Sequence, residues 1–96
     1  MKEVIVDCSG IISSDELWQR YIDAAQPENA SMFGRNLDAF GDAVEGRGPG
    51  WPGEIMLTFK HSEQLRPLRM RGGNGSFLDA LKGIADRSSV VKIDFA

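Results

Sequence analysis

A chain of 96 residues with 42% hydrophobic and 26% charged residues has the size and composition of one globular domain, so we expect a single domain over residues 1–96. No apolar run approaches the roughly 20 residues of a membrane helix, and the N-terminus lacks the apolar stretch of a secretory signal, which favours the cytoplasm and excludes a membrane partner. The 14 Asp and Glu outnumber the 11 Lys and Arg to give a net charge of −3, and because proteins that grip nucleic acid usually carry a basic surplus, we expect no nucleic-acid partner.

The first two predicted elements are a strand and a capped helix. Residues 2–7 contain three consecutive β-branched side chains, a pattern typical of a strand that is covered on both faces, or at least well buried. Ser13 and Glu16 then have the S-x-x-E spacing of a capping box, in which each side chain reaches the other's backbone N–H. Ile12 and Leu17 flank this box with the spacing of a hydrophobic staple. The sequence therefore predicts a helix that begins near residue 14.

The middle of the chain contains a second, shorter helix. Pro27 ends the first helix, and residues 28–34 form a loop. Asn36 is a favourable N-cap for a helix over 37–45, and Gly46 is expected at the position after its last turn, where glycine is favoured.

The second half of the chain is predicted to alternate between strands and helices. An irregular Gly- and Pro-rich segment is expected over 47–53, followed by a strand over 54–60 and a short helix within 61–68. After a basic Gly-rich turn over 69–75, we expect a helix capped by Ser76 and Asp79 and a last strand over 90–95. Strands separated by helical crossovers form a parallel sheet, and right-handed crossovers put the helices on one side. The predicted fold is an α/β domain with a three-stranded parallel sheet and helices packed on one side.

Common signatures of catalysis and metal binding are absent from the sequence. It contains no P-loop, no G-x-G-x-x-G segment after a strand and no H-E-x-x-H. The single histidine, His61, is more typical of a surface or hydrogen-bonded residue than of a catalyst. The single cysteine, Cys8, excludes a disulfide framework and a multi-cysteine metal site, and at a strand end it is typical of a small buried hydrophobe. We expect a protein that is not an enzyme and that has no cofactor and no metal.

The helix over 37–45 combines two features that destabilise it. Asp38, Asp42 and Glu45 gather on one flank, and the two aspartates form an i, i+4 pair about 6 Å apart at Cβ, which repels by some tenths of a kcal/mol. Gly41 lies beside them and costs about 1 kcal/mol relative to alanine inside a helix. Such local costs are expected where function overrides folding. The alternative is a solvated acidic face, with glycine admitted for close packing.

One stretch resembles the signature of the barstar family. The family pattern is an aromatic residue, then Gly-x-Asn-Leu-Asp-Ala, then an apolar pair and Asp, and this chain has Phe33-Gly34-Arg35-Asn36-Leu37-Asp38-Ala39-Phe40-Gly41-Asp42. The order of strands and helices is also similar to that of the family. The resemblance implies an intracellular inhibitor that binds a secreted bacterial guanyl-specific ribonuclease one to one.

The resemblance also implies the mode of inhibition and the residues involved. In the family, the motif helix and the loop before it fill the ribonuclease active site, and carboxylates take the place of substrate phosphates, a role that falls to Asp38 and Asp42. The residues expected to line or shape the contact are Met32, Phe33, Gly34, Arg35, Asn36, Asp38, Gly41, Asp42, Glu45, Gly46 and Trp51. Within this set, Asn36 is expected to act mainly as a helix cap.

Several positions depart from the family pattern. Met32 replaces an aromatic residue, Gly41 replaces a tryptophan, Arg47 replaces a tryptophan after the helix, and Gly83 stands where the family has an acidic contact. Trp51 either supplies the missing aromatic anchor or packs over the sheet edge. These departures favour a different partner within the same class of ribonuclease.

Two other functions are compatible with the sequence. One is a barstar-like module that neutralises a different toxin or regulates a host protein. The other is an enzyme that uses Asp38 and Asp42 as a metal or acid–base pair, although the sequence offers no third ligand and no nearby histidine. The basic cluster Arg66, Arg69 and Arg71 is interpreted as a solvated turn or as the positive end of a molecular dipole that orients the acidic flank.

Overall fold

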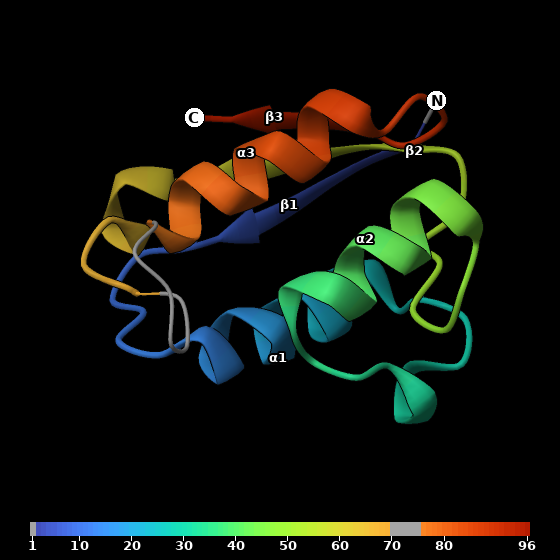
Figure 1. Ribbon diagram of the computed structural model, residues 1–96, viewed down its shortest axis with the longest axis horizontal. Coiled ribbons are helices and arrows are strands. Elements are labelled where there is room, and N and C mark those ends of the chain that lie inside the picture. Colours follow the sequence, from blue (N-terminus) through green and yellow to red (C-terminus); the bar gives the residue numbers. More distant parts are fainter. Residues whose placement is uncertain (1, 70–75) are drawn as a thin grey trace.

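Figure 1 shows a computed structural model that describes residues 2–69 and 76–96. Over these residues the regular elements are, in chain order, β1 (Lys2–Asp7), α1 (Ser14–Ala25), α2 (Leu37–Gly46), β2 (Ile55–Lys60), α3 (Phe77–Arg87) and β3 (Lys92–Phe95), with short 3-10 turns at Ala30–Met32 and Ser62–Leu65. None of these helices is long and apolar enough to cross a membrane.

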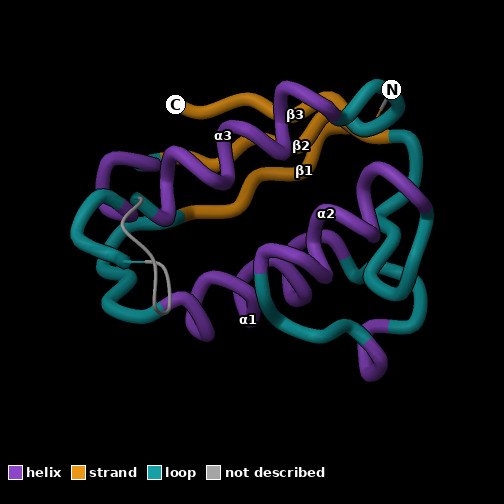
Figure 2. Tube along the Cα trace, in the orientation of Figure 1, coloured by secondary structure: helices purple, strands orange, loops and turns teal. Residues whose placement is uncertain are grey.

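The three strands form one parallel sheet in the order β1-β2-β3. In the register, Val4 of β1 lies opposite Leu57 of β2, and Leu57 lies opposite Ile93 of β3. All strands run in the same direction because each pair is joined through helical segments (Figure 2). The predicted α/β fold with a three-stranded parallel sheet is confirmed.

One face of the sheet is covered and the other is open. Along β1, Val4 and Val6 are buried, whereas the intervening Ile5 is 57% exposed. Among the described residues, the helices cover only the face that carries the buried side chains. The expectation of a strand covered on both faces is therefore wrong, and good burial holds only for the alternate side chains of β1, because a run of β-branched residues reflects strand propensity as well as burial.

Aromatic side chains attach α2 to the rest of the core. The ring of Phe40 lies 5.4 Å from that of Trp18 and 5.3 Å from that of Tyr21, both on α1, and 6.1 Å from that of Phe59 on β2. Tilted and edge-to-face contacts at these distances are favourable and geometrically specific. Because Phe40 fixes one side of α2 against α1 and the sheet, the opposite flank faces outward.

The start of α1 differs from the prediction in two respects. Ser13 accepts a hydrogen bond from the Glu16 N–H at 3.2 Å, as expected of the capping box, but the Glu16 carboxylate accepts from the N–H of Ile12 at 3.1 Å rather than from that of Ser13. The hydrophobic staple does not form, since Ile12 is 86% exposed. Ile11 is buried in its place, which turns Ile12 outward.

The remaining boundaries agree with the prediction to within a few residues. The second strand starts at Ile55 instead of residue 54, and the third at Lys92 instead of residue 90. The short helix expected within 61–68 is a single 3-10 turn. Of the predicted basic turn, Arg69 pairs with Ser76 in an isolated antiparallel bridge, while residues 70–75, and with them Arg71, lie outside the described residues.

Candidate functional site

The start of α2 is fixed by a side-chain cap. Asn36 accepts a hydrogen bond from the Ala39 N–H at 2.7 Å and donates one to the Gly34 carbonyl at 3.2 Å, which confirms the predicted N-cap. Gly34 lies so close to the first turn that an added Cβ would be 3.1 Å from the Ala39 Cβ. Glycine therefore permits the tight approach of the loop to the helix.

The end of α2 lies one residue beyond the prediction. Gly46 is the last helical residue, and Arg47 takes the left-handed conformation with φ of 56°. Its guanidinium lies over the Trp51 ring, 4.9 Å from the centroid, and 3.7 Å from the Glu54 carboxylate. These contacts of the Arg47 side chain accompany a backbone conformation that usually favours glycine. The assignment of Gly46 to the left-handed position is therefore wrong.

The outward flank of α2 carries three carboxylates. Asp38, Asp42 and Glu45 are exposed, whereas Phe40, Gly41, Ala43 and Val44 are buried. Glu45 forms an ion pair with Arg87 of α3 at 3.5 Å. Asp38 and Asp42 make no ion pair with any residue in 2–69 or 76–96. Both aspartates are thus available to a cation from outside this part of the chain.

Gly41 lies at the boundary between α2 and α3. An added Cβ would be 3.3 Å from a carboxylate oxygen of Glu45 and 3.9 Å from the Ile84 side chain. The Ile84 distance is an ordinary van der Waals contact, and the Glu45 carboxylate is the end of a flexible, exposed side chain. Close packing between the helices therefore does not require glycine at this position.

Replacing Gly41 by alanine is expected to stabilise the protein by about 1 kcal/mol, because alanine is the better helix former. In thermal unfolding, this corresponds to a rise of about 4–8 °C for a domain of this size. The matched control is Gly50→Ala, which should destabilise, since Gly50 has φ of 97° and an added Cβ would lie 2.7 Å from Phe33. A lower melting temperature for Gly41→Ala would show that the packing does require glycine.

The segments before and after α2 are joined by backbone hydrogen bonds. The Glu28 N–H donates to the Trp51 carbonyl at 3.0 Å, and the Gly50 N–H donates to the Glu28 carbonyl at 2.8 Å. In these segments Met32 is 71% exposed, and Trp51 is half-buried under Arg47. Both readings of Trp51 stay open, because its ring packs against the core and also reaches the surface.

Phe33 and Arg35 both point toward α1 rather than outward. Phe33 is buried, with its ring 5.7 Å from that of Trp18 and 5.7 Å from that of Tyr21. The Arg35 guanidinium hydrogen-bonds Asp15 and Gln19. The outward flank of α2, with Asp38, Asp42 and Glu45, is the candidate binding face. Phe33 supports this face from beneath, and Arg35 supports it at its edge.

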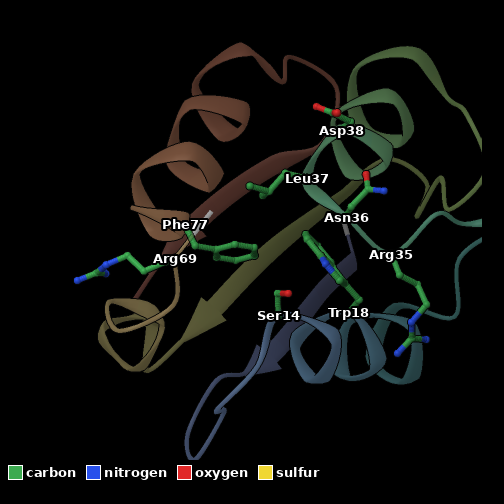
Figure 3. A pocket seen from close by; sticks show the side chains of 8 residues that line it. All are labelled: Ser14, Trp18, Arg35, Asn36, Leu37, Asp38, Arg69 and Phe77. Carbon is green, nitrogen blue, oxygen red and sulfur yellow. The ribbon is translucent and has the colours of Figure 1, made fainter. Parts of the chain in front are cut away.

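A cleft of about 360 Å³ opens beside Asp38 and was not predicted. It is lined by Ser14, Trp18, Arg35, Asn36, Leu37, Asp38, Arg69 and Phe77 (Figure 3). Leu37 and Phe77, the first residues of α2 and α3, supply apolar walls, and the buried Trp18 Nε1 has no hydrogen-bond partner among the described residues. In the sequence, the cleft is indicated only by an apolar residue at the start of α2 and another at the start of α3. The sequence does not show that these two helix ends lie next to each other.

The residues considered for other chemistry lie apart from this face. His61 is exposed after β2 in the left-handed conformation. Cys8 is fully buried, and burial, followed by the charge of Asp7, raises the pKa of its thiol to about 11. Within residues 2–69 and 76–96, no group of three His, Cys, Asp or Glu side chains is placed to hold a metal ion.

Native Cys8 is expected to react with an aromatic disulfide reagent at pH 8 at least ~100-fold more slowly than in the unfolded chain, because the thiolate is the nucleophile and burial suppresses it. The measurement is the rate of absorbance change with and without denaturant. Equal rates would show that Cys8 is accessible and reactive in the folded protein.

Two comparisons with known proteins bear on this site. The family model described as Barstar (barnase inhibitor) matches residues 1–96, the whole chain. No curated protein matches the chain.

Proposed function

We propose, because this chain belongs to the barstar family, that it is an intracellular inhibitor of a secreted bacterial guanyl-specific ribonuclease. It binds the enzyme one to one in the cytoplasm and blocks the active site. Members of the family are inhibitors rather than enzymes, so we assign no catalytic group, cofactor or metal to the chain.

This proposal rests on two carboxylates that are exposed and have no cationic partner among the described residues. Asp38 and Asp42 are exposed one helical turn apart on α2, and no cation among the described residues pairs with them. An enzyme that cleaves RNA must gather Arg, Lys or His side chains around the scissile phosphate. Two carboxylates on a fixed helix pair with such groups through charge-assisted hydrogen bonds, which are short and strong. They therefore take the place of substrate phosphates.

The predicted binding residues divide into contacts and supports. Met32, Asp38, Asp42, Glu45, Gly46 and Trp51 are proposed to contact the enzyme. Phe33, Gly34, Arg35, Asn36 and Gly41 are proposed to shape the face, because they are buried or are engaged in the loop and cap before α2. Glu45 contributes less than the aspartates, since Arg87 already neutralises part of its charge.

The surroundings of the acidic flank support a partner that differs from the family's usual one. Arg47, stacked on Trp51, lies directly after α2, where the family has an aromatic side chain. A partner surface that accepts this face must accommodate the Arg47 side chain, whose charge Glu54 partly neutralises, at the C-terminal end of α2. Like charges at that position would be repelled, which restricts the set of ribonucleases that fit.

The test is titration of the purified chain into a panel of guanyl-specific ribonucleases, with residual RNA cleavage as the readout. The proposal predicts full inhibition of at least one enzyme at a ratio of one to one. Absence of inhibition across the panel by a folded protein would contradict it and would favour the alternative, a barstar-like module that neutralises another toxin or regulates a host protein.

A further inference from the structure

We infer that Arg35 is a positioning residue of the inhibitory face: it ties the start of α2 to α1 and so fixes the direction of Asp38. This inference rests on the proposed function, since it concerns the same face. It makes specific the expectation that Arg35 lines or shapes the contact.

Three hydrogen bonds join Arg35 to the first turns of α1. Its Nε donates to the Asp15 carboxylate at 2.8 Å, one Nη to the Gln19 side-chain carbonyl at 3.0 Å, and the other Nη to the Asp15 backbone carbonyl at 3.1 Å. We call these contacts the Arg35 bridge. The planar guanidinium suits such a set, because its donors stand in a fixed fork that a lysine does not have.

The backbone at Arg35 has a conformation that is unusual for arginine. Arg35 has φ of 55°, in the left-handed region that side chains other than glycine, asparagine and aspartate rarely occupy. The next residue, Asn36, is extended with φ of −150° and caps α2. The chain reverses sharply between loop and helix at this one residue, and the Arg35 bridge stabilises the reversal from the side chain.

The bridge and the core hold the loop from two sides. Phe33 is inserted between Trp18 and Tyr21 on the inside, and Arg35 binds the outer side of α1. Figure 3 shows the Arg35 side chain at the edge of the cleft, directed toward α1, while the Asp38 side chain points to the opposite side. The charged groups of Arg35 and Asp38 therefore lie on different sides of the start of α2.

The two aspartates depend on the bridge to different degrees. Asp38 lies in the first turn of α2, three residues after Arg35, where Asn36 caps the helix and its neighbours Leu37 and Ala39 are only partly buried against the core. Asp42 lies one turn further, beside the buried Phe40 and Val44. Loss of the bridge should loosen the first turn, so that ordering Asp38 becomes a cost of binding, whereas Asp42 should stay in place.

The variant that isolates the bridge is Arg35→Gly, because glycine keeps the left-handed conformation without strain and removes all three hydrogen bonds. In the free protein, we expect amide hydrogen exchange at Ala39 and Phe40, whose N–H groups donate to Asn36, to accelerate by about tenfold, with exchange at the core residue Val44 unchanged. In the complex, we expect the inhibition constant to rise by about tenfold. Arg66→Gln, which removes an arginine from a surface pair with Glu63, is the charge-matched control and should change neither quantity.

A double-mutant cycle separates positioning from direct contact. In an Asp38→Ala background, Arg35→Gly should add almost nothing to the loss of inhibition, whereas in an Asp42→Ala background it should retain its full effect. Asp15→Ala should reproduce part of the loss although it lies on α1, and should not add to Arg35→Gly. An undiminished effect of Arg35→Gly without Asp38 would overturn the inference in favour of direct contact. Unchanged exchange at Ala39 and Phe40 would overturn it even if no ribonuclease is inhibited, so its failure is distinguishable from that of the proposed function.

Discussion

The Asp42→Ala variant is expected to bind the inhibited ribonuclease more than about tenfold more weakly while its melting temperature stays nearly unchanged. A hydrogen bond to a charged group contributes about 1.5–3 kcal/mol, and 1.4 kcal/mol corresponds to tenfold in affinity. Stability should not fall, because Asp42 is exposed, alanine favours the helix, and its repulsion with Asp38 is relieved.

The measurement is isothermal titration of each variant with the enzyme, together with thermal unfolding of the free inhibitor. The control is Asp94→Ala, which removes the same charge from an exposed site on β3, away from α2. Equal affinities for the Asp42→Ala and Asp94→Ala variants would mean that Asp42 acts only through the net charge of the protein.

The Phe40→Ala variant is expected to lose about 3–5 kcal/mol of unfolding free energy, the usual cost of truncating a buried aromatic side chain. Phe40 is fully buried, and its ring contacts Trp18, Tyr21 and Phe59. The lost contacts are with three rings on two elements, α1 and β2, so the surrounding structure cannot close the cavity. The melting temperature should fall by more than about 10 °C.

The control for this substitution is Ile5→Ala on the open face of the sheet. Because Ile5 is 57% exposed, its truncation should change the free energy of unfolding by less than about 0.5 kcal/mol. Chemical denaturation of both variants gives the comparison. A Phe40→Ala variant as stable as Ile5→Ala would show that α2 is not attached to the core through this ring.

The features that the sequence predicts well are those set by neighbouring residues. Ser13, Asn36 and Ser76 are N-caps because a short polar side chain reaches a backbone N–H three residues on. The parallel sheet follows from strands that alternate with helical segments, since parallel neighbours need a crossover. Both patterns are contained within a few residues or in the order of elements, so the sequence alone predicts them.

The features that the sequence does not predict depend on distant partners. Ile5 and Ile12 are apolar and were assigned to buried positions, but the open sheet face and the burial of Ile11 leave them exposed. Arg47 takes the left-handed position expected of glycine at residue 46, and its side chain contacts Trp51 and Glu54 across the following loop. Local propensity contains no information on such contacts.

For the candidate site, the sequence identifies the residues but not the ion pairs and hydrogen bonds that they form. The family motif selects Asp38 and Asp42, and helical spacing adds Glu45, yet only the fold shows that Arg87 of α3 pairs with Glu45 and with neither aspartate. The Arg35 contacts with α1 join residues up to twenty positions apart, so they too require the fold. Whether these residues bind a ribonuclease stays a prediction.

The most direct test of phosphate mimicry by α2 is a crystal structure of the chain bound to the ribonuclease that it inhibits. The account predicts that α2 enters the active site and that the carboxylates of Asp38 and Asp42 lie within ion-pair distance of the Arg, Lys or His side chains that hold the scissile phosphate. A complex in which another surface contacts the enzyme, with α2 far from those groups, would contradict it.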